Sequence, residues 1–140
     1  MPPAAVEAAA AGMTQLLDAP LWPLGTDALV GVMDRLQVLR RQAEAVQLRL
    51  LREIEARGVP AEQGARNVKD WLRGRYRCTG SQAHADAAAA SATDPERGEL
   101  AELGAALAAG QIPRAHLDVA VRVMARIPRV LAEGRRAEVA

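Results

Sequence analysis

Residues 26–57 read TDALVGVMDRLQVLRRQAEAVQLRLLREIEAR, a continuous helical pattern that decides the fold class. Thr26 or Asp27 can cap the start of this helix, because a short polar side chain there accepts a hydrogen bond from a free backbone amide. Gly58 and Pro60 end the pattern, as residues at and beyond a helix C-terminus often do. At 1.5 Å per residue, the predicted helix is roughly 45 Å long.

Apolar residues recur along this helix at alternating spacings of three and four, which is the pattern of a heptad seam. Two kinds of neighbour can cover such a seam. The first is the set of later helices of the same chain, which is favoured because no polar residue on the seam would fix its register against a second chain. The second is a helix of another chain, through self-association as a dimer or docking of a partner. The seam residues are Leu29, Val32, Leu36, Leu39, Ala43, Val46 and Leu50.

Shorter helical patterns lie on both sides of this segment. Asn67 is a good N-cap for a short helix that contains Trp71, and it follows a polar loop over residues 59–66. Thr79 and Gln82 form a predicted capping box, in which each side chain bonds to the backbone amide of the other residue. Asp94 followed by Pro95 predicts a further helix start. The expected helices cover residues 3–17, a short segment after Asn67, and about 80–93, 95–110, 113–127 and 130–139.

No stretch alternates apolar and polar residues with the β-branched and aromatic content of a strand. The sequence therefore predicts an all-α helical bundle, with one long helix over about 26–57 packed by several shorter helices. Residues 1–25 are expected to form an N-terminal helix and a Pro-rich linker, and residues 26–140 a helical domain. The last segment has no glycine cap or polar tail, so we expect an N-terminal fragment of a longer protein.

Composition excludes several classes of function. The net charge of the 140 residues is +1, so any attraction for nucleic acid must be local. Aromatic residues make up 2% of the chain, and the predicted core consists of aliphatic side chains and alanine. With a single cysteine, no recognisable signal peptide and no apolar run of about 20 residues, we expect a cytoplasmic protein without a membrane segment.

No catalytic or metal-binding arrangement is recognisable in the sequence. His84, His116 and Cys78 are far apart and lack the spacing of metal ligands. No glycine-rich loop joins a strand to a helix, which argues against a nucleotide site. We therefore expect no catalytic residue, no cofactor, no metal and no small-molecule ligand.

One local cluster is basic and aromatic. Lysine and arginine side chains can neutralise phosphates, and an exposed tyrosine can stack on a base, so the cluster is a candidate contact site for DNA. The alternative is structural: Trp71 anchors a short helix in the core, and the basic residues form the solvated face of that helix. The candidate contact residues are Arg66, Lys69, Arg73, Arg75, Tyr76 and Arg77.

Six segments stand in an order and spacing that are more specific than ordinary helix signals. They are LLREIEARG at 50–58, GAR at 64–66, WL at 71–72, TGSQA at 79–83, LAAGQIP at 107–113 with His116, and Ile127 with Pro128. Together they resemble the domain of unknown function 222, also called the 13E12 repeat family, of actinobacterial proteins. The resemblance extends over roughly residues 29–128.

The resemblance implies a helical domain that, in longer proteins, precedes an HNH-type nuclease domain. This chain has no His-Asn-His constellation, so no catalytic role carries over to any of its residues. It also departs from the family at Thr79, Gly80 and Ser81 and in its alanine-rich following helix, which argues against DNA contact by that helix. We expect a non-catalytic accessory domain of an HNH-endonuclease-type protein that positions DNA, or alternatively a self-association or partner-docking module without a nucleic-acid role.

Overall fold

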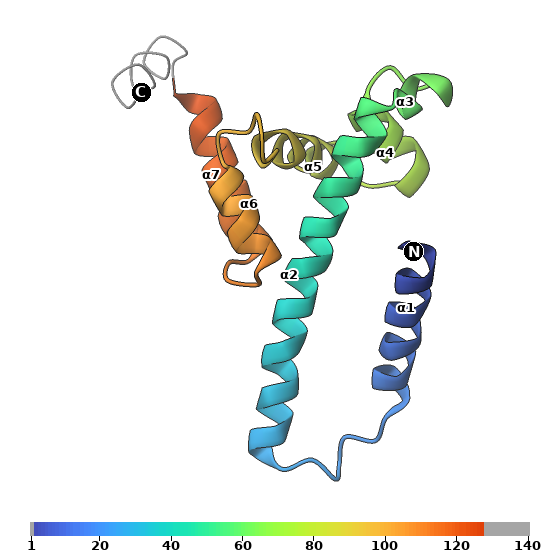
Figure 1. Ribbon diagram of the computed structural model, residues 1–140, viewed down its shortest axis with the longest axis vertical. Coiled ribbons are helices and arrows are strands. Elements are labelled where there is room, and N and C mark those ends of the chain that lie inside the picture. Colours follow the sequence, from blue (N-terminus) through green and yellow to red (C-terminus); the bar gives the residue numbers. More distant parts are fainter. Residues whose placement is uncertain (1, 128–140) are drawn as a thin grey trace. The chain divides into compact units, whose positions relative to one another are not determined.

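The computed structural model describes residues 2–127, which form helices and no strands. The predicted all-α class is confirmed, and the long helix α2 has the expected extent (Figure 1). The segment expected to be helical over residues 130–139 lies outside the described residues. The helices are α1 Pro2–Asp18, α2 Thr26–Ala56, α3 Val59–Glu62, α4 Val68–Tyr76, α5 Gly80–Ala92, α6 Ala101–Ala108 and α7 Arg114–Arg126.

The chain divides into two compact units, with the boundary after Arg35 inside α2. The first unit contains α1, the Pro-rich linker and the first turns of α2. Its large apolar side chains are exposed, most of all Leu17 at 85% and Trp22 at 87%. Within the described part of the chain, no helix is long and apolar enough to cross a membrane.

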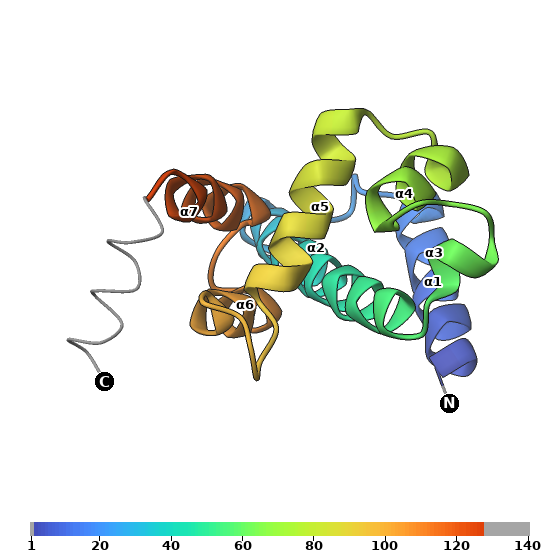
Figure 2. The ribbon, with the colours of Figure 1, turned by 90° about the horizontal axis from the view of Figure 1, so that it is seen from above.

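The second unit, from Leu36 on, contains the hydrophobic core. Leucines from three helices, Leu48 of α2, Leu107 of α6 and Leu117 of α7, are its largest fully buried side chains. Helix α5 crosses α2 and contributes mainly alanine to the core, and α6 and α7 form a helical hairpin (Figure 2). Small side chains let helices approach closely but bury little apolar area each. The other core residues are Leu51, Val68, Trp71, Leu72, Ala83, Ala89 and Ala90.

Most predicted helix ends are confirmed. Gly58 follows α2 with a left-handed φ of 69°. Asn67 caps α4 by accepting a hydrogen bond from the amide of Asp70, and Thr79 caps α5 by accepting one from the amide of Gln82. The second half of the capping box is wrong, because the Gln82 side chain donates to Asp86 instead of the Thr79 backbone. The prediction of a loop over 59–66 is also wrong at its start, where α3 forms a short helical turn.

The helix predicted to begin at Asp94 and Pro95 begins only at Ala101. The Asp94 side chain caps a tight turn by accepting a hydrogen bond from the amide of Glu96, and this bond lowers the pKa of the carboxyl group. Gly98 lies against the carbonyl group of Ala92, so a Cβ at this position would clash with the backbone. Asp94 and Pro95, which are typical of a helix start, therefore form a turn here, and this turn brings the chain back to the end of α5.

A matched pair of substitutions on α2 tests this assignment of the core. Leu48→Ala removes a side chain that is 1% exposed, so we expect a loss of about 2 to 5 kcal/mol in the free energy of unfolding. Leu50→Ala changes a side chain that is 56% exposed and should cost less than about 0.5 kcal/mol. Urea denaturation followed by circular dichroism measures both, and equal losses would contradict the assignment.

Candidate functional site

The candidate DNA-contact residues lie on and around α4, which a buried tryptophan anchors to the core. Trp71 is 7% exposed, and its indole nitrogen donates a hydrogen bond of 2.7 Å to Oε1 of Gln63 in the preceding segment. Trp71 is therefore a core residue, as the structural alternative predicts. The arginines around it are exposed, whereas Lys69 is half-buried.

Three of the six candidates interact with other side chains of the protein. The guanidinium of Arg66, which precedes α4, pairs with Asp70 in the first turn of the helix at 3.1 Å. The guanidinium of Arg75 lies 5.8 Å from the centre of the Trp71 ring, in a cation–π arrangement. The Tyr76 ring meets Trp71 edge to face with 5.7 Å between centroids, although Tyr76 remains 61% exposed. These three side chains support the local structure of α4.

The other three candidates form a basic row. Lys69 and Arg73 are four residues apart, which places them on one side of α4, and Arg77 follows at the C-terminal cap of this helix. None of the residues 2–127 forms an ion pair with any of them. The guanidinium of Arg73 also lies against Gly80, at the start of α5, where free backbone amides add partial positive charge.

Arg77 has an unusual backbone conformation. It caps the C-terminus of α4 with φ 56°, in the left-handed region, and it is the only residue other than glycine with a positive φ in the described part of the chain. Glycine is the common residue at such a helix end, and a side chain there costs about 1 to 2 kcal/mol. An arginine is therefore present at a position where glycine would fit the backbone better.

A buried ionic network, which sequence analysis missed, joins α2, α5 and α7. The guanidinium of Arg114 contacts Asp86 at 2.6 Å, Asp118 at 2.9 Å and Glu44 at 2.9 Å. The Asp86 side chain is 6% exposed and also accepts hydrogen bonds from Gln82 and Gln47. The available signal was Asp86 itself, which is the only acidic residue in the alanine-rich α5.

The network raises the pKa of Arg114. Burial lowers the pKa of this guanidinium, but its hydrogen bonds to Asp86 and Asp118 raise it, and the resulting pKa lies above the ordinary value. A group whose pKa is raised by folding stabilises the folded state below its unfolded pKa, and loses this effect only as the pH rises through the folded value. The contribution of Arg114 is therefore present throughout the neutral range, and its role is to hold helices together.

Two arginines of α2 also have structural partners. Arg41 donates to the carbonyl oxygen of Gly110 at 3.0 Å. Arg52 donates to the carbonyl oxygen of Ala90 at 3.1 Å and to the hydroxyl of Thr93 at 3.0 Å. Each satisfies backbone or hydroxyl oxygens near the end of a helix, so neither is free to bind a ligand.

The histidines and the cysteine do not come together. His84 and His116 are exposed on different helices, and Cys78 is half-buried before α5. Among residues 2–127, no group of three histidine, cysteine or acidic side chains is arranged to hold a metal ion.

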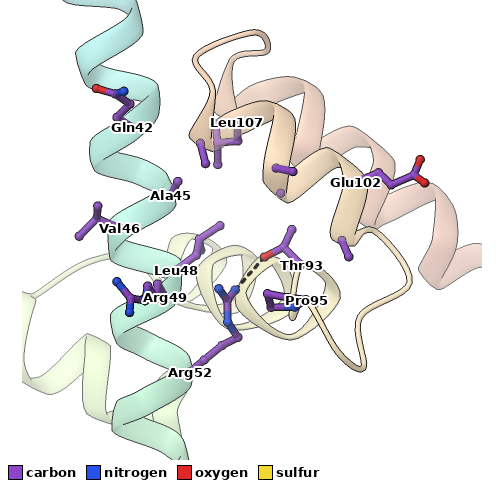
Figure 3. Close-up of a pocket in the computed structure, with 14 residues that line it drawn as sticks. Gln42, Ala45, Val46, Leu48, Arg49, Arg52, Thr93, Pro95, Glu102 and Leu107 are labelled. Carbon is purple, nitrogen blue, oxygen red and sulfur yellow. Dashed lines mark hydrogen bonds between the residues drawn. The ribbon is translucent and has the colours of Figure 1, made fainter.

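An open groove of about 720 Å³ lies between α2 and α6 (Figure 3). Leu48 and Leu107 form its base, and Ala45 and Ala105 line its two sides. At one end of the groove, the guanidinium of Arg52 donates a hydrogen bond to the hydroxyl of Thr93, so these two polar groups are paired with each other. Because most of its lining is apolar, the groove offers packing surface for another molecule.

The heptad seam is exposed where α2 belongs to the second unit. Leu39, Val46 and Leu50 are 37%, 54% and 56% exposed, Ala43 is exposed, and only Leu36 is half-buried. In the first unit, Leu29 and Val32 are 45% and 42% exposed. The packing against later helices that we expected of the seam is made instead by another face of α2, which carries Leu48 and Leu51. The helix has two apolar faces, and periodicity alone did not show which one the chain buries.

Comparison with known proteins identifies a family. The model of the family described as "Domain of unknown function (DUF222)" matches residues 30–140, well over half of the chain. No curated protein and no solved structure matches the chain.

Replacing Arg114 tests the buried network. Arg114→Met leaves the carboxylate of Asp86 buried without its cation, and we expect a loss of about 3 to 5 kcal/mol in the free energy of unfolding. The control is Arg66→Met, which breaks an exposed pair with Asp70 and should cost no more than about 1 kcal/mol. Urea denaturation of both variants decides the matter, and an Arg114→Met loss as small as the control would show that the network does not hold the helices.

Proposed function

The chain belongs to the DUF222 family, and from this premise we propose that it is a non-catalytic helical accessory domain that contacts the nucleic-acid backbone through α4. Its parent type is an HNH-endonuclease-type protein of the cytoplasm, in which a separate nuclease domain performs the chemistry. The domain itself holds the DNA in position and supplies no catalytic group.

The observation that carries this proposal is the basic row of Lys69, Arg73 and Arg77. Lys69 and Arg73 lie about one helical turn apart, Arg77 follows at the end of the same helix, and no carboxylate among residues 2–127 forms an ion pair with them. Phosphate binding by lysine and arginine releases condensed counterions, which is the main source of sequence-independent affinity for DNA. Because the whole chain carries a net charge of only +1, this local concentration of positive charge is needed for such binding.

The backbone of Arg77 gives independent support. A side chain in the left-handed region reduces stability, and the positive charge at the end of α4 compensates only partly through the helix dipole. A role of the Arg77 guanidinium in binding, and not in stability, explains why arginine is present where glycine would remove the backbone strain.

The proposal predicts salt-dependent DNA binding. We expect the chain to bind short duplex or single-stranded DNA at about 50 mM salt and to lose affinity steeply by about 200 mM. Lys69→Ala, Arg73→Ala and Arg77→Gly together should weaken binding and reduce the slope of log K against log salt by about 1 for each lost phosphate contact. Fluorescence anisotropy with labelled oligonucleotides measures both quantities.

The matched control removes three exposed arginines elsewhere, through Arg97→Ala, Arg122→Ala and Arg126→Ala. It changes the net charge equally, so it should leave most of the affinity intact if α4 is the interface. Arg77→Gly alone should leave the protein as stable as the wild type or more so, while DNA binding falls. Absence of wild-type binding at low salt, or equal losses in the two triple variants, would refute the proposal.

A second candidate function is helix docking along α2, and the exposed seam favours it. Leu39, Ala43, Val46 and Leu50 form an apolar stripe at heptad spacing on the outside of the second unit. Such a stripe is the surface by which one amphipathic helix recognises another.

A neutral peptide tests docking separately from DNA binding. A helical peptide with leucine at its two apolar heptad positions and glutamine at the flanking positions should bind the chain. The substitution Val46→Glu should weaken this binding at least about tenfold, because it places a charge in the apolar contact. Val46 is 54% exposed, so the variant should keep the wild-type melting temperature. If the wild type and Val46→Glu bind the peptide with equal affinity, the seam is excluded as the docking surface.

A further inference from the structure

We infer that the seam of α2 binds an amphipathic helix of a separate polypeptide whose apolar stripe is flanked by acidic residues. The inference rests on the second candidate function, helix docking along the seam, and it adds the chemistry of the partner. It is independent of the proposed contact between α4 and DNA.

The docking face lies apart from the face that α2 buries. Val46 and Leu48 are two positions apart, which corresponds to about 200° around a helix. Leu48 is 1% exposed in the core, whereas Val46 is 54% exposed. In Figure 3 the side chains of Ala45 and Val46 point to different sides of α2, and both border the groove. A partner can therefore cover the seam without displacing any core contact.

The exposed seam is long enough for a specific helix contact. From Leu36 to Leu50, it covers two heptad repeats and about 21 Å of α2. Apolar side chains occupy every seam position in this stretch, so a partner helix with the same spacing can interlock with them. No polar seam residue selects a partner or an orientation, which leaves this selection to the flanking positions.

The flanking positions are basic or neutral. They are occupied by Arg40 and Gln47 on one side of the stripe and by Gln42 and Arg49 on the other. Both arginines are exposed, and neither has an ion-pair partner in the part of the chain that the structure describes. The nearest acidic residue of α2, Glu44, is bound by Arg114 on the core side. A docked helix therefore meets positive charge along both edges of the stripe.

A second copy of this chain is a poor occupant of the same surface. Two copies paired through this stretch would bring together flanks that contain only arginine and glutamine. Arg40 and Arg49 would find no carboxylate there, and like charges across a helix pair are unfavourable. A partner with glutamate or aspartate beside its apolar stripe removes this repulsion and pairs both arginines.

Two peptides that differ only in flank charge test the inference. Both have leucine at the apolar heptad positions, and the flanking positions are glutamate in one peptide and lysine in the other. We expect the full chain to bind the glutamate peptide at least about tenfold more tightly at low salt. The difference should shrink as salt rises, because exposed charges are screened. Fluorescence anisotropy of the labelled peptides measures the affinities.

Charge reversal on α2 provides the decisive variant. Arg40→Glu with Arg49→Glu should transfer the preference to the lysine peptide. The control, Arg122→Glu with Arg126→Glu, makes the same change of net charge on α7 and should keep the preference of the wild type. Circular dichroism melts verify that both variants are folded.

Three results would overturn the inference. Equal affinity for the two charged peptides would leave helix docking intact but remove its acidic selectivity. Failure of both charged peptides and the glutamine peptide would reject docking itself, without bearing on DNA binding by α4. A wild-type dimer in sedimentation that Val46→Glu converts to a monomer would assign the seam to a second copy.

Discussion

The second unit depends on the burial of one guanidinium group. Arg114 reaches from α7 to Asp86 of α5 and Glu44 of α2, and thereby ties together three helices that are distant in sequence. The buried side of α5 is mainly alanine, which leaves the rotation of this helix poorly determined by shape. Asp86 determines it, because a buried carboxylate must face its cation. In a core with few large side chains, the ionic network gives an orientation that apolar packing alone does not.

The arginines of this protein have different environments that composition cannot separate. Arg41, Arg52 and Arg114 donate to oxygens inside the second unit, and they are part of the fold. Others, among them Arg40, Arg49, Arg73 and Arg77, are exposed and have no acidic partner among residues 2–127. The arginines used in the proposals for DNA and for a partner helix are all of this second kind. A net charge of +1 thus coexists with two local basic surfaces.

Sequence patterns predicted the helices better than their contacts. The extent of α2 and the caps at Asn67 and Thr79 follow from local hydrogen bonding, which short segments determine by themselves. The turn after Asp94 was missed because its closure depends on the carbonyl of Ala92, and a cap signal does not distinguish a helix from a turn.

Contacts between distant segments account for the other differences. Apolar periodicity identified the seam, but α2 carries a second apolar face with Leu48, and only the positions of α5 and α6 decide which face is buried. For the candidate site, the sequence identified the basic and aromatic residues around Trp71. Only the fold shows which arginines have partners within the protein and which do not.

The environments of the two tryptophans have a spectroscopic consequence. Trp71 is buried and hydrogen-bonded and Trp22 is 87% exposed in the other unit, so their fluorescence should differ in wavelength and in access to dissolved quenchers, and each unit carries its own optical reporter.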